Sequence, residues 1–127
     1  MRVVFYILAG LTVIASAKES LPERWYQEQV AAKLGGKMEA RVDNGRVDVL
    51  TTTHAIEVEF AAKWKQSIGQ CLWYSMQTNK PAGIVLIITD DKRDRPHVIR
   101  LGSVIEKNKL PIKLWLWPDD FRMSQPQ

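Results

Sequence analysis

The chain has 127 residues, a length that allows one domain. Hydrophobic residues make up 46% of the chain and five residues are Trp, which is enough for a packed core and excludes a disordered polypeptide. The net charge of +4 suits a polyanionic partner. Many proteins without such a partner carry the same mild excess, so the charge alone selects no function.

The first 17 residues have the three parts of a secretory signal. A basic residue at position 2 precedes an apolar run over residues 3–14, and the small residues Ala15 and Ala17 follow it. The run is too short to span a bilayer comfortably. We therefore predict a signal peptide over residues 1–17, export to the periplasm or the medium, no stable membrane insertion after cleavage, and a single domain over residues 18–127. An uncleaved anchor or an N-terminal strand is the alternative.

The single cysteine, Cys71, excludes an internal disulfide, so an exported domain must be stabilised by core packing. Its apolar helical surroundings predict a buried small hydrophobic residue and not a nucleophile. The first helix of that domain is predicted to begin within Ser20-Leu21-Pro22-Glu23, with Ser20 or its neighbour as the cap, and to run to about Leu34. Pro22 stands in its first turn, and Gly35-Gly36 ends it with residues that readily adopt positive φ.

A β-hairpin is predicted around Asp43-Asn44-Gly45, because an Asn-Gly pair favours a tight turn between antiparallel strands. Its two strands cover about residues 37–42 and 46–51. Side chains alternate along a strand, so Asp48 lies on the face opposite to that of the valines beside it.

A third strand is predicted over residues 55–60 and carries Glu57 and Glu59 on one face. These acids would lie on the wet face of a half-exposed antiparallel sheet in the simplest interpretation. A helix follows at once and must cover one face, which weakens that interpretation.

The helix over residues 62–77 has two distinct sides. Its apolar stripe consists of Trp64, Ile68, Cys71, Leu72 and Ser75. The adjacent stripe, at spacings of four, three and four residues, consists of Lys63, Ser67, Gln70 and Tyr74. Such a stripe is usually a solvated face, but this one begins four residues after a strand that bears two acids.

The next strand, over residues 82–89, is continuously apolar, which is typical of a central strand that pairs in parallel with the strand before the helix. The remaining elements are predicted as a charged loop (90–96), a short strand (98–101), a helix (102–109), an edge strand (112–117) and a polar tail from Asp119 onward. This order predicts an α/β fold with a mixed central sheet flanked by helices.

Three carboxylates on neighbouring strands predict a divalent-metal site. Buried acids are costly unless they bind something, and metal-dependent phosphodiester hydrolysis needs carboxylates, an activated water and a nearby positive group. Asp48 and Glu57 can converge on one cation, and the backbone carbonyl of Val58 can supply a further oxygen ligand. A neighbouring lysine would then stabilise the charge that develops on phosphorus.

This arrangement resembles the PD-(D/E)xK nuclease superfamily, whose members have the restriction-endonuclease-like αβββαβ core. Asp48 and Glu57, nine residues apart, match the two acidic positions, and the resemblance covers residues 23–88. It implies a nuclease, or endonuclease, that uses Mg²⁺ or Mn²⁺ to hydrolyse phosphodiester bonds, with DNA favoured over RNA. The segment from Gln70 to Tyr74 also resembles the QxxxY motif of nuclease domains in recombination helicases, which implies that both residues lie beside the nucleic acid.

The main departure from the family pattern is Glu59, which stands where a lysine is expected. The resemblance then makes Lys63 the leading candidate for that role and Lys65 the second, with Lys65 also a candidate substrate contact. Glu59 becomes an extra metal ligand. The acid that the first helix often contributes is best matched by Glu23, ahead of Glu39 and Glu28.

The same departure keeps two other functions open. One is a non-catalytic module on the same fold that binds nucleic acid or a protein. The other is an envelope protein whose acids are surface residues. His54, just before the third strand, is interpreted as a turn residue. Whether the chain forms a homodimer is left open by the sequence.

Overall fold

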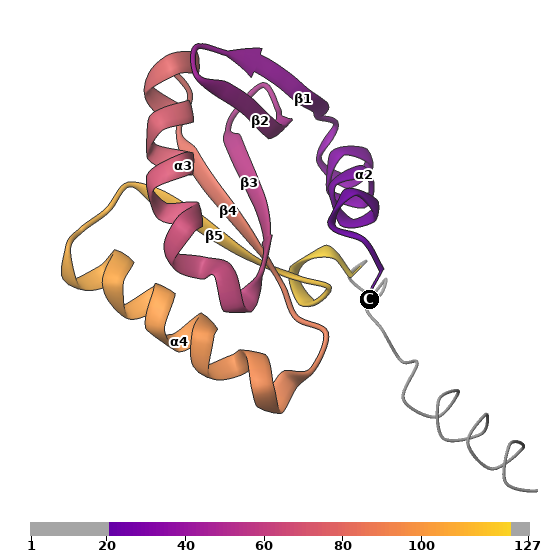
Figure 1. Cartoon of the computed structure of the whole chain (residues 1–127), viewed down its shortest axis with the longest axis vertical. Helices are drawn as coiled ribbons and strands as arrows, with labels where there is room; N and C mark the ends of the chain where they lie inside the picture. The colour runs from indigo at the N-terminus through magenta and orange to yellow at the C-terminus, as the bar shows by residue number, and fades with distance from the viewer. Residues whose placement is uncertain (1–20, 123–127) are drawn as a thin grey trace, which may run out of the picture.

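The computed structural model describes residues 21–122, which form a five-stranded sheet with helices on both faces (Figure 1). The predicted signal peptide over residues 1–17 lies outside these residues. Within residues 21–122, no helix has the length and apolar character needed to cross a membrane.

The elements follow one another in an order close to the predicted one. They are α2 (Glu23–Leu34), β1 (Lys37–Val42), β2 (Gly45–Leu50), β3 (Ala55–Phe60), the 3₁₀ turn η1 (Ala61–Lys63), α3 (Trp64–Thr78), β4 (Ala82–Ile87), α4 (Asp91–Lys107), β5 (Ile112–Trp117) and the 3₁₀ turn η2 (Asp119–Phe121). The hairpin turn falls at Asn44 and Gly45, where φ is 58° and 156°, values that these two residue types tolerate.

The strands lie in the sheet in the order β1-β2-β3-β4-β5. β1, β2 and β3 form an antiparallel meander, and β4 and β5 run parallel to β3. The mixed sheet and the parallel pairing of β3 with β4 are therefore confirmed. The β2–β3 pairing is short, since its register joins only Val49 with Ile56 and Leu50 with Ala55. Beyond Ile56, the side of β3 that faces β2 is left without a backbone ladder.

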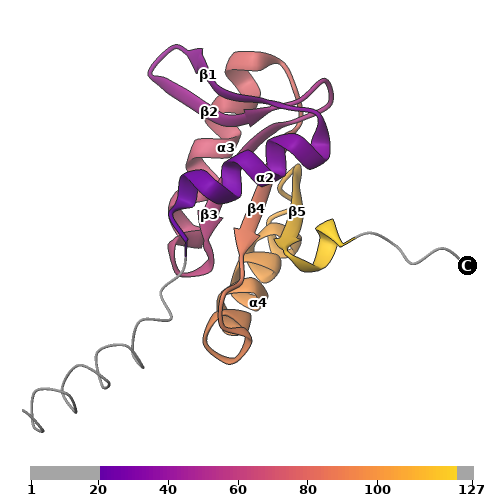
Figure 2. The same cartoon turned by 90° about the vertical axis from the view of Figure 1, so that its right-hand side faces the viewer.

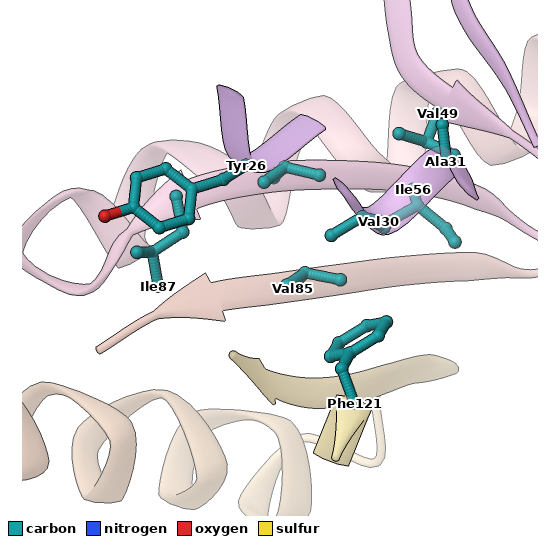
Figure 3. Close-up of a cluster of buried hydrophobic side chains, with 9 residues drawn as sticks. Tyr26, Val30, Ala31, Val49, Ile56, Val85, Ile87 and Phe121 are labelled. Atoms are coloured by element: carbon teal, nitrogen blue, oxygen red, sulfur yellow. The ribbon is translucent and has the colours of Figure 1, made fainter. Parts of the chain in front are cut away.

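α2 covers one face of the sheet, and α3 and α4 cover the other (Figures 1 and 2). Figure 3 shows the cluster under α2, in which Tyr26 and Val30 pack against Val85 and Ile87 of β4. Alternate residues of β4, among them Ile84, join α3 and α4 in a second cluster. β4 is thus buried on both faces, as its continuous apolar sequence predicts, and this packed centre holds β3 in place.

The prediction of a charged loop and a short strand between residues 90 and 101 is wrong, because α4 begins at Asp91. Asp90 caps the helix by accepting a hydrogen bond at Oδ1 from Arg93 N (3.0 Å). Asp94, which is 3% exposed, accepts from the backbone amides of Thr89 and Asp90. Acidic side chains at a helix N-terminus are stabilising. The charged residues that predicted a solvated loop therefore stabilise the N-terminus of α4, and the helix continues past Pro96.

The predicted polar tail is also wrong at its beginning. η2 follows β5 directly, and its Phe121 is buried against the cluster under α2 (Figure 3). The structure confirms the assignment of Cys71 as a buried small side chain, and its thiol donates to the carbonyl of Ile68.

Candidate functional site

A pocket of about 350 Å³ lies between the N-terminal part of α2, the β1–β2 hairpin, β3 and α3. Its lining contains five acids, one arginine, one amide, one phenol and one glycine: Glu23, Glu39, Asp48, Glu57, Glu59, Arg46, Gln70, Tyr74 and Gly45. The structure therefore brings together most of the residues that the sequence singles out, from five separate elements.

Asp48 is fixed at the place where the ladder between β2 and β3 ends. Its Oδ2 accepts a hydrogen bond from the backbone amide of Val58 (2.9 Å), which has no β2 backbone partner in the register. The amide and the carbonyl of one strand residue point to the same side of the strand. The carbonyl of Val58 is consequently directed toward the Asp48 side of β3, where the sequence predicts a metal ligand.

Glu57 is the most unusual side chain in the pocket. It is only 4% exposed, and within residues 21–122 its Oε1 atom is buried without a hydrogen-bond partner. An ionised carboxylate in that position is costly. Burial raises the pKa of Glu57 to about 9, and the nearby charge of Asp48 contributes to the rise.

Asp48 and Glu59 are also less acidic than exposed carboxyls. Burial raises the pKa of Asp48 to about 6, against the hydrogen bond from Val58, which lowers it. Glu59 is 8% exposed, and burial together with the charge of Glu23 raises its pKa to about 7. The interpretation of Glu57 and Glu59 as wet-face residues is therefore wrong.

The two lysines of the sequence prediction differ in position. Lys63 Nζ lies 4.0 Å from Glu59 Oε1, and its side chain is 59% exposed. Lys65 lies over the ring of Trp64, 5.7 Å from the ring centroid, and is not part of the pocket lining. Of the two candidates, the structure brings only Lys63 to the acids.

Gln70 and Tyr74 line the pocket from α3, with Gln70 exposed and Tyr74 buried. The Tyr74 hydroxyl lies so close to Gly45 that a Cβ atom there would approach it to 2.5 Å. Burial raises the pKa of Tyr74, and the charge of Glu57 adds to the effect. Ser67, from the same predicted stripe, is instead buried and donates to the carbonyl of Trp64.

Glu23 lines the pocket and lies beside its helical neighbour Gln27, whose amide donates to Glu23 Oε1 (3.5 Å). Glu28 lies away from the pocket, where it pairs with Arg24 on the exposed side of α2. His54 stands in the turn between β2 and β3, as expected, and its ring contacts that of Trp115 edge-on.

Sequence reasoning missed Arg46 and ranked Glu39 too low. The hairpin register pairs Met38 with Val49 and Ala40 with Val47, so Glu39 stands opposite Asp48. Arg46 precedes Asp48 by two residues and therefore shares its face. The Asn-Gly turn fixes this register, so counting outward from the turn would have located both residues. Glu39 also has a φ of 51°, an uncommon value for a non-glycine residue in a strand.

No three Asp, Glu, His or Cys side chains within residues 21–122 are arranged as a ready-made metal-binding group. What the pocket offers is a close pair of carboxylates, Asp48 and Glu57, with the carbonyl side of Val58 beside them. Glu23 and Glu59 form a second pair of neighbouring acids.

Sequence comparison finds similarity to three KilA-N domain-containing proteins of Acanthamoeba polyphaga mimivirus. One is 39% identical over 54 residues, which is 42% of this chain and 22% of that protein. A second is 36% identical over 73 residues (57% and 20%), and a third is 28% identical over 93 residues (73% and 25%). The chain thus spans a quarter or less of the length of each relative. No family model matches the chain, and neither does any solved structure.

Proposed function

We propose that this protein is a metal-dependent nuclease that hydrolyses phosphodiester bonds in DNA, on a restriction-endonuclease-like core made of α2, β1, β2, β3, α3 and β4. The observation that carries the proposal is Glu57, whose buried Oε1 atom has no hydrogen-bond partner within residues 21–122 and lies beside Asp48 in an open pocket. Burial and the neighbouring Asp48 raise the pKa of Glu57 to about 9, so the metal-free pair holds a proton near neutral pH, and a divalent cation in place of that proton would offset the charge of both carboxylates.

The donor set fits Mg²⁺ or Mn²⁺. Mg²⁺ is usually held in proteins by one or two carboxylates, with waters and substrate phosphate as its other ligands. Asp48, Glu57 and the carbonyl of Val58 meet that requirement without a third acidic side chain. When bound, the cation would activate a water and neutralise charge on the phosphate.

The remaining residues have roles that follow from their positions. Lys63, at the start of α3, would offset the charge of Glu59 and of the reacting phosphate. Gln70 and Tyr74, which line the pocket from α3, would lie beside the nucleic acid. Glu23 and Glu59 would orient the waters around the cation.

A second candidate function is a non-catalytic nucleic-acid-binding or protein-binding module on the same fold. The observation that favours it is the position of Lys63, since its amine is 4.0 Å from Glu59, its side chain is largely exposed, and it is not part of the pocket lining. A catalytic lysine is normally held close to the metal ligands.

Cleavage of supercoiled plasmid by the full chain tests the proposal. We expect nicking in Mg²⁺ or Mn²⁺ and none in excess chelator. Asp48→Asn and Glu57→Gln should abolish it, whereas Glu106→Gln, which alters an exposed acid on α4, should not. Activity that survives chelation, or that both pocket variants retain, would remove the metal site from the reaction. DNA binding without cleavage in the same preparation would favour the binding module.

A further inference from the structure

We propose that Arg41 and Arg46 form a phosphate-binding strip on the β1–β2 hairpin, which holds one DNA backbone against the mouth of the acidic pocket. The inference rests on the proposed function in taking DNA as the partner. It adds a substrate-positioning surface at residues that the nuclease resemblance does not include.

The hairpin register places the two arginines directly opposite each other, because Arg41 pairs with Arg46 across the strands. Directly opposed side chains of an antiparallel pair lie on the same face, which Arg46 shares with Asp48. Both arginines are exposed. The strip therefore runs up to the pocket in which the phosphodiester would be cut.

This pairing is unfavourable for the isolated protein. Like charges directly opposite each other on a sheet destabilise it. Arg41 has no ion pair within residues 21–122 that would relieve the repulsion, and Arg46 has a loose one, with its Nη1 atom 3.7 Å from Glu39 Oε2. A polyanion lying along the hairpin would supply the missing negative charge.

Glu39 is arranged so that Arg46 can change partners. Its other oxygen, Oε1, lies 3.0 Å from Arg24 Nη1, a closer contact than the one to Arg46. A phosphate that takes Arg46 from Glu39 therefore leaves Glu39 neutralised by Arg24. Guanidinium groups bind phosphate in a bidentate manner, which strengthens the exchanged contact.

The pocket itself cannot hold a phosphate without such help. Five acids line it and Arg46 is the single basic side chain of the lining among the described residues. The bound cation would offset part of this negative charge at the scissile phosphate. The phosphates on either side of the cleaved bond still need a positive surface, and the strip lies beside them.

Binding of a short labelled DNA duplex in excess chelator tests the strip separately from cleavage. Each phosphate contact contributes a slope of about 0.9 in log affinity against log salt. Arg41→Ala and Arg46→Ala should each lower this slope by about 1, and weaken binding by roughly eightfold at about 0.1 M salt. Arg100→Ala, which removes an exposed arginine from α4, is the matched control and should change neither quantity.

Two further variants keep the test informative. Arg46→Lys retains the charge without the bidentate geometry and should bind with intermediate affinity. Glu39→Gln should tighten binding, because it frees Arg46 and removes a negative charge. Thermal unfolding verifies that each variant folds, and Arg41→Ala should be no less stable than the wild type, since it removes a like-charge pair.

The two experiments distinguish an error in the phosphate-binding strip from an error in the proposed nuclease function. If Arg41→Ala and Arg46→Ala bind no more weakly than Arg100→Ala, or if the wild type does not bind DNA, the strip is wrong. If the wild type binds through the two arginines and does not cut in Mg²⁺ or Mn²⁺, the nuclease proposal fails and the strip stands.

Discussion

Replacing Glu57 by Gln keeps the shape of the side chain and removes the buried carboxylate, so it separates a functional acid from a structural one. In the wild type the Oε1 atom lies within the fold without a hydrogen-bond partner among the described residues, next to Asp48. The amide that replaces the carboxylate would be neutral at every pH and able to donate to Asp48. We therefore expect Glu57→Gln to make the metal-free protein more stable.

The size of the effect follows from the pKa of Glu57, which burial and then Asp48 raise from 4.5 to about 9. The folded state binds more protons than the unfolded state between these values, so the stability of the wild type falls as pH rises from about 4.5 to about 9. One pKa unit corresponds to about 1.4 kcal/mol. With Asp48 sharing the effect, Glu57→Gln should gain on the order of 2–4 kcal/mol at about pH 8 and little at about pH 4.5.

Thermal unfolding of the wild type and the variant at several pH values measures this gain. For a domain of this size, about 1 kcal/mol shifts Tm by roughly 5 °C, so the difference near pH 8 should be easily measured. Mn²⁺ should raise the Tm of the wild type at that pH and leave that of Glu57→Gln unchanged, because a ligand stabilises only the state that binds it. Glu106→Gln is the control for the loss of an exposed acid.

A variant that is no more stable than the wild type at the higher pH would contradict this expectation. It would mean that Glu57 is held by favourable contacts in the folded chain, and that no cation is required to explain its burial. If Glu57→Gln raised the free energy of unfolding equally at the lower and the higher pH, the stabilisation would not come from removing the carboxylate charge.

Three further predictions concern other residues of the site. Asp48→Ala should be about 1–3 kcal/mol less stable in urea unfolding than Asp48→Asn, because both variants remove the buried charge and only Asn keeps an acceptor for the β3 backbone amide; equal stabilities would exclude that hydrogen bond as the cause. Gly45→Ala should destabilise the hairpin, because its Cβ would lie 2.5 Å from the Tyr74 hydroxyl, and Tyr74→Phe should partly restore the Tm; no rescue would place the strain elsewhere. Lys63→Ala should lower plasmid cleavage much more than Lys65→Ala, and equal activities would assign the positive role to another residue.

Much of the framework follows from local sequence patterns. Three of these patterns depend only on residues close together in the sequence. They are the alternation along β3, the Asn-Gly turn and the continuous apolar run of β4. The bounds of β3 and β5 agree with the predicted ones for this reason. Asp48, Glu57 and Glu23 line one pocket, as expected from elements that adjoin in both sequence and space.

The rest depends on relations that no local pattern contains. The run from Asp90 to Pro96 has the composition of a loop, and it is helical because Asp90 and Asp94 satisfy backbone amides at the start of α4. The exposed position of Lys63 depends on the direction in which the 3₁₀ turn η1 continues into α3. The burial of Glu57 depends on α3 covering its face of the sheet, and a strand sequence alone does not report what lies above it.

In a regular sheet the amide of Val58 would donate to a backbone carbonyl of the neighbouring strand. Here it donates to the side chain of Asp48, which is titratable. A hydrogen bond between two backbones does not depend on pH or on metal ions. The bond to Asp48 weakens when the carboxylate is protonated, and it competes with any cation that the carboxylate binds. The Val58 amide is thereby a natural reporter of the site, whose hydrogen-exchange rate would register proton and metal occupancy. The hydrogen bond that follows the last β2–β3 backbone pair thus makes this part of the sheet sensitive to pH and, under the proposed function, to the bound cation.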